Sequence, residues 1–171
     1  PHTYRGLAPH RTVLDNGAVV IAKTTSTTPA VAINLGVHSG SAYDPAGQPG
    51  AAWLLSRVLD RGTASRSAAD IAEELDSRGI TLTITVARHL LSLVCTCLVE
   101  DLDPILGTLA DIVMQPAFPD REVETRRGEI VTMIRQDEDN PAAMAAEGLL
   151  ALLYGQAHPY GRRPRGTVET V

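Results

Sequence analysis

The chain has 171 residues, of which 44% are hydrophobic, and this is enough to bury one core. Its formal net charge of -5 and its pI near 5.5 argue against nucleic-acid binding, which requires a clustered basic surface. No apolar run approaches the length that crosses a bilayer, and the first residues show no signal-peptide pattern, so we expect a soluble protein.

Three strands are predicted before residue 40. A hairpin is indicated by residues 11–14 and 18–22 around Asp15-Asn16-Gly17, because Asn-Gly supplies the positive φ angles of a tight turn. The β-rich run 31–38 predicts the third strand. A loop with prolines and glycines follows over 39–50 and leads into a helix that carries Trp53.

Helices surround a further strand pair in the rest of the chain. Ser67 is a suitable N-cap for a helix over 68–77, and residues 80–86 and 90–98 are rich in strand formers. The remaining predicted elements are helices over 102–113, from 120 until the break at 137–141, and over 142–153. This order predicts an α+β fold, with helices packed on a mostly antiparallel sheet, and one domain over 1–171.

The sequence offers little to hold a metal or a phosphate. Cys95 and Cys97 are two apart in a strand, so they cannot close a sound disulfide, and we expect buried free thiols. The five histidines form no His-x-x-x-His pair, and His38, His89 and His158 lie in or beside strands and loops. Gly36-x-x-x-Gly40 lacks the lysine of a phosphate-binding loop.

The stretch from Gly50 to Thr63 has the frame of a zinc-peptidase helix without its ligands. It resembles the helix of the pitrilysin/insulinase family of inverted-motif zinc metallopeptidases (inverzincins), which opens on glycine, carries His-x-x-Glu-His and ends near Gly-Thr. Without a gap, the two histidines fall on Trp53 and Arg57 and the general-base glutamate on Ser56. Histidines four apart share one helical face and reach one Zn²⁺, whereas an indole and a guanidinium cannot bind it.

The resemblance extends across nearly the whole chain. Further segments similar to family markers are Leu14-Asp15-Asn16-Gly17, Gly40-Ser41-Ala42-Tyr43-Asp44, Leu106 to Phe118, Glu138-Asp139-Asn140-Pro141 and His158-Pro159-Tyr160-Gly161. They occur in the family's order, and agreement among independent signals supports membership. The family implies a pitrilysin-like α+β domain, followed by more helix, a closing strand and a second domain, so we expect an incomplete N-terminal domain.

The same resemblance places the third zinc ligand, a glutamate in active members, on Met133. A second acidic position becomes Arg126, and an Asn-Ala pair beside the substrate backbone becomes Leu82-Thr83. A thioether is a soft, weak donor for Zn²⁺. We therefore predict no catalytic residue, no metal and no cofactor, and the motif positions are Trp53, Ser56, Arg57 and Met133.

Each substituted residue also has a structural interpretation. Trp53 would fill the space of the lost imidazole and metal, Arg57 would pair with an acidic side chain or a partner's carboxylate, and Met133 would be core. Ser56 has no base nearby in sequence, which disfavours a nucleophilic role.

We therefore expect a non-catalytic homologue, inactive alone, that recognises substrate or forms the chamber for a zinc-bearing peptidase subunit. Non-zinc subunits of two-subunit processing peptidases are similar in this respect, with a peptide or unfolded polypeptide as substrate. The alternatives are a structural scaffold, like core proteins of a respiratory complex, and an active metallopeptidase with a remade site. One lysine and abundant alanine hint at a G+C-rich bacterial genome, and with no signal-peptide pattern we expect a protein of the bacterial cytoplasm. No substrate-binding residue can be named.

Overall fold

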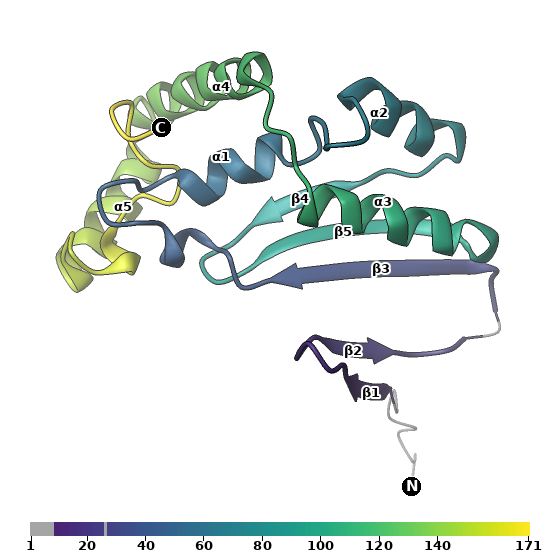
Figure 1. The fold of residues 1–171 in the computed structure, drawn as a ribbon. Helices are drawn as coiled ribbons and strands as arrows, with labels where there is room; N and C mark the ends of the chain where they lie inside the picture. Colours follow the sequence, from purple (N-terminus) through teal and green to yellow (C-terminus); the bar gives the residue numbers. More distant parts are fainter. Residues whose placement is uncertain (1–8, 26) are drawn as a thin grey trace, which may run out of the picture. The chain divides into compact units, whose positions relative to one another are not determined.

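The computed structural model describes residues 9–25 and 27–171, which divide into two compact units, Pro1–Ala30 and Val31–Val171. Figure 1 shows their elements. The strands are β1 (His10–Val13), β2 (Val19–Ala22), β3 (Ala30–Val37), β4 (Thr83–Val86) and β5 (Leu91–Leu98). The α-helices are α1 (Ala51–Val58), α2 (Ala68–Ser77), α3 (Leu102–Met114), α4 (Asp120–Glu138) and α5 (Pro141–Tyr154), and short 3₁₀ turns are η1 (Ser41–Tyr43), η2 (Val99–Asp101) and η3 (Pro159–Gly161).

The first unit contains the predicted hairpin. β1 and β2 pair in antiparallel register, with Val13 opposite Val19. Gly17 takes φ +84° in the turn, and the amide of Leu14 donates to the carbonyl of Ala18 at 2.8 Å. The hairpin is confirmed, but only Gly17 has the positive φ that was predicted for Asn-Gly, and Asn16 contributes by accepting a hydrogen bond from the amide of Ala18 at 3.0 Å.

The second unit is built on a three-stranded sheet in the order β3-β5-β4, with β4 and β5 antiparallel. Residues along β5 alternate between buried and less buried, because successive side chains of a strand point to opposite faces. The central strand thus supplies Leu91, Leu93, Cys95 and Cys97 to a core that α3 covers with Ile105, Leu109 and Ile112. The α+β class with an antiparallel sheet is confirmed.

Two element boundaries differ from the predicted ones. β4 begins at Thr83 rather than near residue 80, because the amide of Ile80 still donates to Leu75 at the end of α2. α4 continues through Asp137 to Glu138, and Asn140 caps α5 instead. None of the described helices is long and apolar enough to cross a membrane.

Candidate peptidase-like site

Helix α1 is anchored at its first residue by a buried carboxylate. Asp44 accepts hydrogen bonds from the amides of Gly50 and Ala52, both at 2.8 Å, and so satisfies donors that a helix start leaves free. Gly50 takes φ +101°, and a Cβ there would lie 2.6 Å from the carbonyl oxygen of Arg165. The C-terminal segment therefore lies directly against the start of the helix that carries the motif positions.

Three of the motif positions lie on α1. We expected Trp53 to be a buried packing residue, but its side chain is only half-buried. Its indole nitrogen is buried and has no hydrogen-bond partner in residues 9–25 and 27–171. The guanidinium carbons of Arg165 and Arg57 lie 4.7 and 5.7 Å from its ring centroid, within cation–π range. Ser56 is buried and donates its hydroxyl proton to the carbonyl of Trp53 at 2.7 Å. This hydroxyl is therefore engaged in a hydrogen bond within its own helix.

A cavity of about 240 Å³ opens beside these residues, where α1, β4 and α4 meet. We call it the arginine cavity. Its lining residues are Ser56, Arg57, Asp60, Arg61, Leu82, Thr83, Ile84, Arg126 and Glu129. The structure thus brings together Ser56, Arg57, Arg126 and Leu82-Thr83, which the family frame had selected from distant parts of the sequence.

Ion pairs balance two of the three arginines in this cavity. Arg126 donates from Nη1 to Oε1 of Glu129 at 2.6 Å, and Nε of Arg61 lies 3.2 Å from Oδ1 of Asp60. Within the described part of the chain, no carboxylate lies within 4.0 Å of the Arg57 guanidinium. The counter-charge expected for Arg57 is therefore not a close ion pair in this structure.

The arginines also fix the ionisation of Glu129. The hydrogen bond from Arg126, with the positive charges of Arg126, Arg57 and Arg61, holds the pKa of Glu129 below its usual value. The same hydrogen bond, with the charge of Glu129, raises the pKa of Arg126. The cavity is therefore a set of permanent charges rather than an acid and base poised for proton transfer.

The side chains at the motif positions do not fit a zinc ion. Met133, half-buried on α4 seven residues after Arg126, offers only a thioether, and Trp53 and Arg57 offer no lone pair. No three His, Cys, Asp or Glu side chains are grouped to hold a metal in residues 9–25 and 27–171. We therefore derive no metal chemistry for these positions.

Two of the histidines lie in an exposed aromatic cluster that the sequence did not indicate. Its rings are Tyr43, His89, Tyr154, His158 and Tyr160. Nε2 of His89 is hydrogen-bonded to the hydroxyl of Tyr160, and the ring of His158 lies 5.4 Å from that of Tyr160. The cluster forms where η1, the turn between β4 and β5, the end of α5 and η3 with its cap His158 come together, so no local motif could reveal it.

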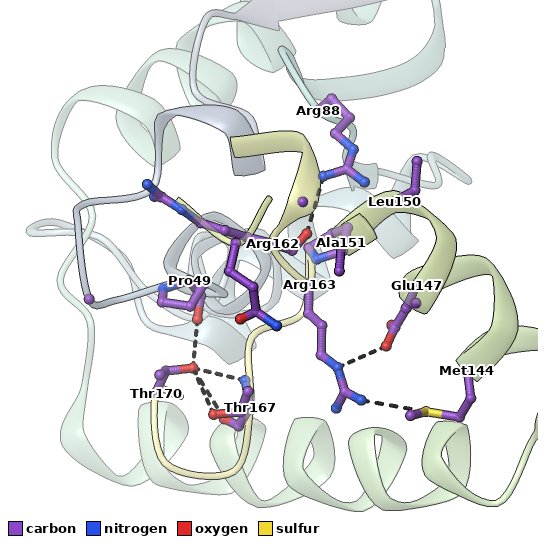
Figure 2. A pocket seen from close by; sticks show the side chains of 15 residues that line it. Pro49, Arg88, Met144, Glu147, Leu150, Ala151, Arg162, Arg163, Thr167 and Thr170 are labelled. Atoms are coloured by element: carbon purple, nitrogen blue, oxygen red, sulfur yellow. Dashed lines mark hydrogen bonds and ion pairs between the residues drawn. The ribbon is translucent and has the colours of Figure 1, made fainter. Parts of the chain in front are cut away.

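A larger cavity, about 610 Å³, lies between α5, the loop before α1 and residues 156–170 (Figure 2). Arg163 extends along it and is held by Glu147 at 2.8 Å and Glu138 at 3.2 Å. Thr170 donates its hydroxyl to the carbonyl of Pro49 at 2.9 Å and closes one side. The ion pairs of Arg163 thus fasten the C-terminal segment to α4 and α5, and the hydroxyl of Thr170 fastens it to the loop before α1.

The fold and the site agree with the class predicted from the sequence: an α+β unit with a helix framed like that of an inverted-motif zinc peptidase, and with Trp53, Ser56 and Arg57 at the positions predicted for the motif. Residues 19–163 match the family described as Insulinase (Peptidase family M16), and the chain belongs to this family. An uncharacterized zinc protease of Mycobacterium tuberculosis is 31% identical over 165 residues, which are 96% of this chain and 37% of that protein. The mitochondrial-processing peptidase subunit alpha of Solanum tuberosum is 31% identical over 160 residues, 94% of this chain and 31% of the relative.

Solved structures share the fold. A protein described as a peptidase M16 inactive domain from Pseudomonas fluorescens has a TM-score of 0.90 at 23% identity, over 96% of this chain and 40% of that one. A protease from Helicobacter pylori has a TM-score of 0.80 at 19% identity, over 95% and 39%. The chain thus spans less than half the length of the relatives that it matches.

Proposed function

We propose that this chain is a non-catalytic member of the insulinase family, which serves as the recognition or chamber-forming partner of a zinc-bearing peptidase subunit. In this proposal residues 1–171 form a single N-terminal domain of the family type. The substrate of the complex is a peptide or an unfolded polypeptide. One observation carries the proposal: the residues at the motif positions are Trp53, Ser56, Arg57 and Met133.

Chemistry excludes these four side chains from the roles of two imidazoles and two carboxylates. The hydroxyl of Ser56 is hydrogen-bonded to its own helix and cannot replace a glutamate as general base for water. Of the three ligand positions only Arg57 lines the arginine cavity, where Arg126 adds a second guanidinium, and Trp53 and Met133 do not line it. Two guanidinium groups beside the second ligand position repel Zn²⁺ rather than attract it. The site has therefore changed its charge as well as lost its ligands.

One relative supports a role in a complex, and one solved structure supports the loss of activity. The relative is named as the alpha subunit of a processing peptidase, and the structure with the same fold is described as an inactive domain of the family. These similarities favour a non-catalytic member of a complex, and the recognition role is the part that we propose.

The proposal is tested with the full-length protein and a zinc-bearing family member from the same source. Elemental analysis of the purified protein after dialysis should find far less than one zinc per chain. Zinc near one per chain, or chelator-sensitive cleavage by this protein alone after repurification, would overturn the non-catalytic proposal.

The partner role needs a separate measurement. Mixing the two proteins should give chelator-sensitive cleavage well above that of the zinc-bearing member alone, and the two should co-elute in size-exclusion chromatography. A scaffold would co-elute without changing cleavage, so co-elution with unchanged activity contradicts the recognition role.

A further inference from the structure

The side chains that line the arginine cavity carry one positive charge in excess, and one more carboxylate, Glu122, lies outside the lining at 3.8 Å from Nη2 of Arg126. The cavity is lined by three arginines and by the carboxylates of Asp60 and Glu129, which gives 3 - 2 = +1. Asp60 and Glu129 are engaged by Arg61 and Arg126, so the excess belongs to Arg57, whose side chain is exposed. An exposed guanidinium at the mouth of a cavity is accessible to a ligand.

Two further donors in the cavity wall have no acceptor. The Nε atoms of Arg61 and Arg126 are buried and make no hydrogen bond in the described part of the chain, because the contact of Arg61 Nε with Asp60 lacks hydrogen-bond geometry. These N–H groups belong to guanidiniums already paired with Asp60 and Glu129, so the excess positive charge remains that of Arg57. The hydrogen bond from Arg126, with smaller contributions from the charges of Arg126, Arg57 and Arg61, lowers the pKa of Glu129, so Arg57 lies within electrostatic range of this carboxylate.

The size of the cavity limits what can enter it. Its volume of about 240 Å³ is below the roughly 300–1,000 Å³ that is common for small-molecule sites. It therefore suits one side chain rather than a whole cofactor. A carboxylate fits both the size and the charge, since guanidinium groups bind carboxylates with two parallel hydrogen bonds.

The strand that borders the cavity can hold the backbone of a peptide. β4 is the last strand of its sheet, and β5 is its neighbour on the other side. The amide of Ala87 donates to the carbonyl of Leu90 at 2.8 Å. In an antiparallel pair every second residue bonds the neighbouring strand, so the backbone N–H and C=O groups of Thr85 and Thr83 point to β5. Those of Ile84, which lies between them, point to the open edge of the sheet. Ile84 also lines the cavity, so a residue of an added strand would lie beside Arg57.

We propose that the arginine cavity binds the carboxylate of an extended peptide, with Arg57 as the residue that selects acidic over neutral or basic side chains. This inference names the kind of substrate that the proposed recognition role would select. It rests on the proposed function in one respect, namely that the bound peptide is not cleaved. The positive charge of a metal is then replaced by a guanidinium, which selects substrate instead of activating water.

Fluorescence polarisation with the full chain tests the charge preference. The probes are labelled seven-residue peptides of alternating Thr and Val with blocked ends and a central Glu, Gln or Lys. The Glu peptide should bind about tenfold more tightly than the Gln peptide, as a hydrogen bond between charged groups allows. The Lys peptide should bind most weakly, and added salt should reduce the difference between Glu and Gln.

Variants of Arg57 identify the selecting residue. Arg57→Gln should remove the advantage of the Glu peptide and leave binding of the Gln peptide unchanged, and Arg57→Glu should favour the Lys peptide. Arg135→Gln, an exposed arginine on α4 outside the cavity lining, is the matched control and should change nothing. Circular dichroism and melting temperature confirm that each variant is folded.

Three binding results would contradict the proposed charge selection. Equal binding of the Glu, Gln and Lys peptides, no binding at all, or an Arg57→Gln variant with the wild-type preference would overturn the inference. A peptide of Thr and Val with a free C-terminus, set against its amide, shows whether a terminal carboxylate is taken in place of a side chain. Mass spectrometry of the mixtures reports cleavage separately, so an acidic preference with cutting would refute only the non-catalytic function.

Discussion

Three side chains of the loop after α1 converge on the carboxylate of Asp111 in α3. Oδ2 of Asp111 accepts from the hydroxyl of Ser65 at 2.6 Å, from Nη1 of Arg66 at 2.8 Å and from the hydroxyl of Thr63 at 3.3 Å. The hydrogen bond from Ser65, with the charge and hydrogen bond of Arg66, lowers the pKa of Asp111. The stretch from Gly50 to Thr63, singled out in the sequence, ends at Thr63, but the hydrogen bond from Thr63 to Asp111 in α3 depends on tertiary structure.

Asp111→Asn should lower the melting temperature at neutral pH, and the difference from wild type should shrink in acid. Because the folded pKa lies below the ordinary value of 3.8, this stabilisation is complete above pH 3.8 and is lost as the pH falls through the folded pKa. Thermal melts of both proteins from pH 7 to pH 2.5 check this. A difference that stays constant over that range would show that ionisation of Asp111 does not matter.

The thiols of Cys95 and Cys97 should be unreactive in the folded chain. Both are buried and free, and burial raises the pKa of each above the ordinary value of 9.0. A thiol reagent should modify them slowly in native buffer and completely in denaturant, because the thiolate is the reactive form. Since the native state holds these protons longer, stability should also fall as the pH rises above about 9. Rapid modification without denaturant would contradict this.

At the scale of elements, the start of α1 depends on a glycine for two separate reasons. Gly50 has φ +101°, a backbone conformation that residues with a Cβ rarely adopt. A Cβ at this position would also lie 2.6 Å from the carbonyl oxygen of Arg165 and 2.8 Å from the side chain of Val171. Gly47 has a similar φ of +86° but has open space around it. A substitution at Gly47 therefore measures backbone strain alone, whereas the same substitution at Gly50 measures backbone strain and a steric clash together.

Gly47→Ala should cost about 1–2 kcal/mol, the usual penalty of a left-handed backbone for a residue with a Cβ. Gly50→Ala should cost clearly more, because it must also displace the C-terminal segment. Denaturant unfolding of both variants gives the two values. Hydrogen exchange of residues 163–171 should increase in Gly50→Ala alone, and equal losses of stability would contradict the clash.

For the whole molecule, local signals predicted the elements well and their contacts less well. Asn16-Gly17, the Ser67 cap and the apolar spacing of 102–113 act within a few residues, and the corresponding hairpin and helices are confirmed. The stacking of Arg165 on Trp53 joins residues that are far apart in sequence, and so does the aromatic cluster around Tyr160. No period or cap encodes such contacts. The resemblance to the family did predict that Arg57 and Arg126 lie at one site, because the family's motifs are defined by residues that meet in its folded structure.

That resemblance also makes a prediction about zinc. A chain with Trp53→His, Ser56→Glu, Arg57→His and Met133→Glu should bind Zn²⁺, because residues 53 and 57 share one face of α1 and α1 packs against α4. The affinity should be modest, since groups that orient the imidazoles have not been restored and their loss typically weakens a metal site about 10–100-fold. Arg126, which stays positive beside the new site, should weaken it further.

Calorimetric titration with Zn²⁺ measures this binding, and a variant with the other three substitutions but Arg57 retained is the matched control. The control should bind little zinc, because it keeps a cation in place of one imidazole. Cleavage should still be absent from the four-substitution chain, since a metal without further parts to position the peptide does not align the reacting atoms. A four-substitution chain that folds normally and takes up no zinc would show that the motif positions have been assigned to the wrong residues.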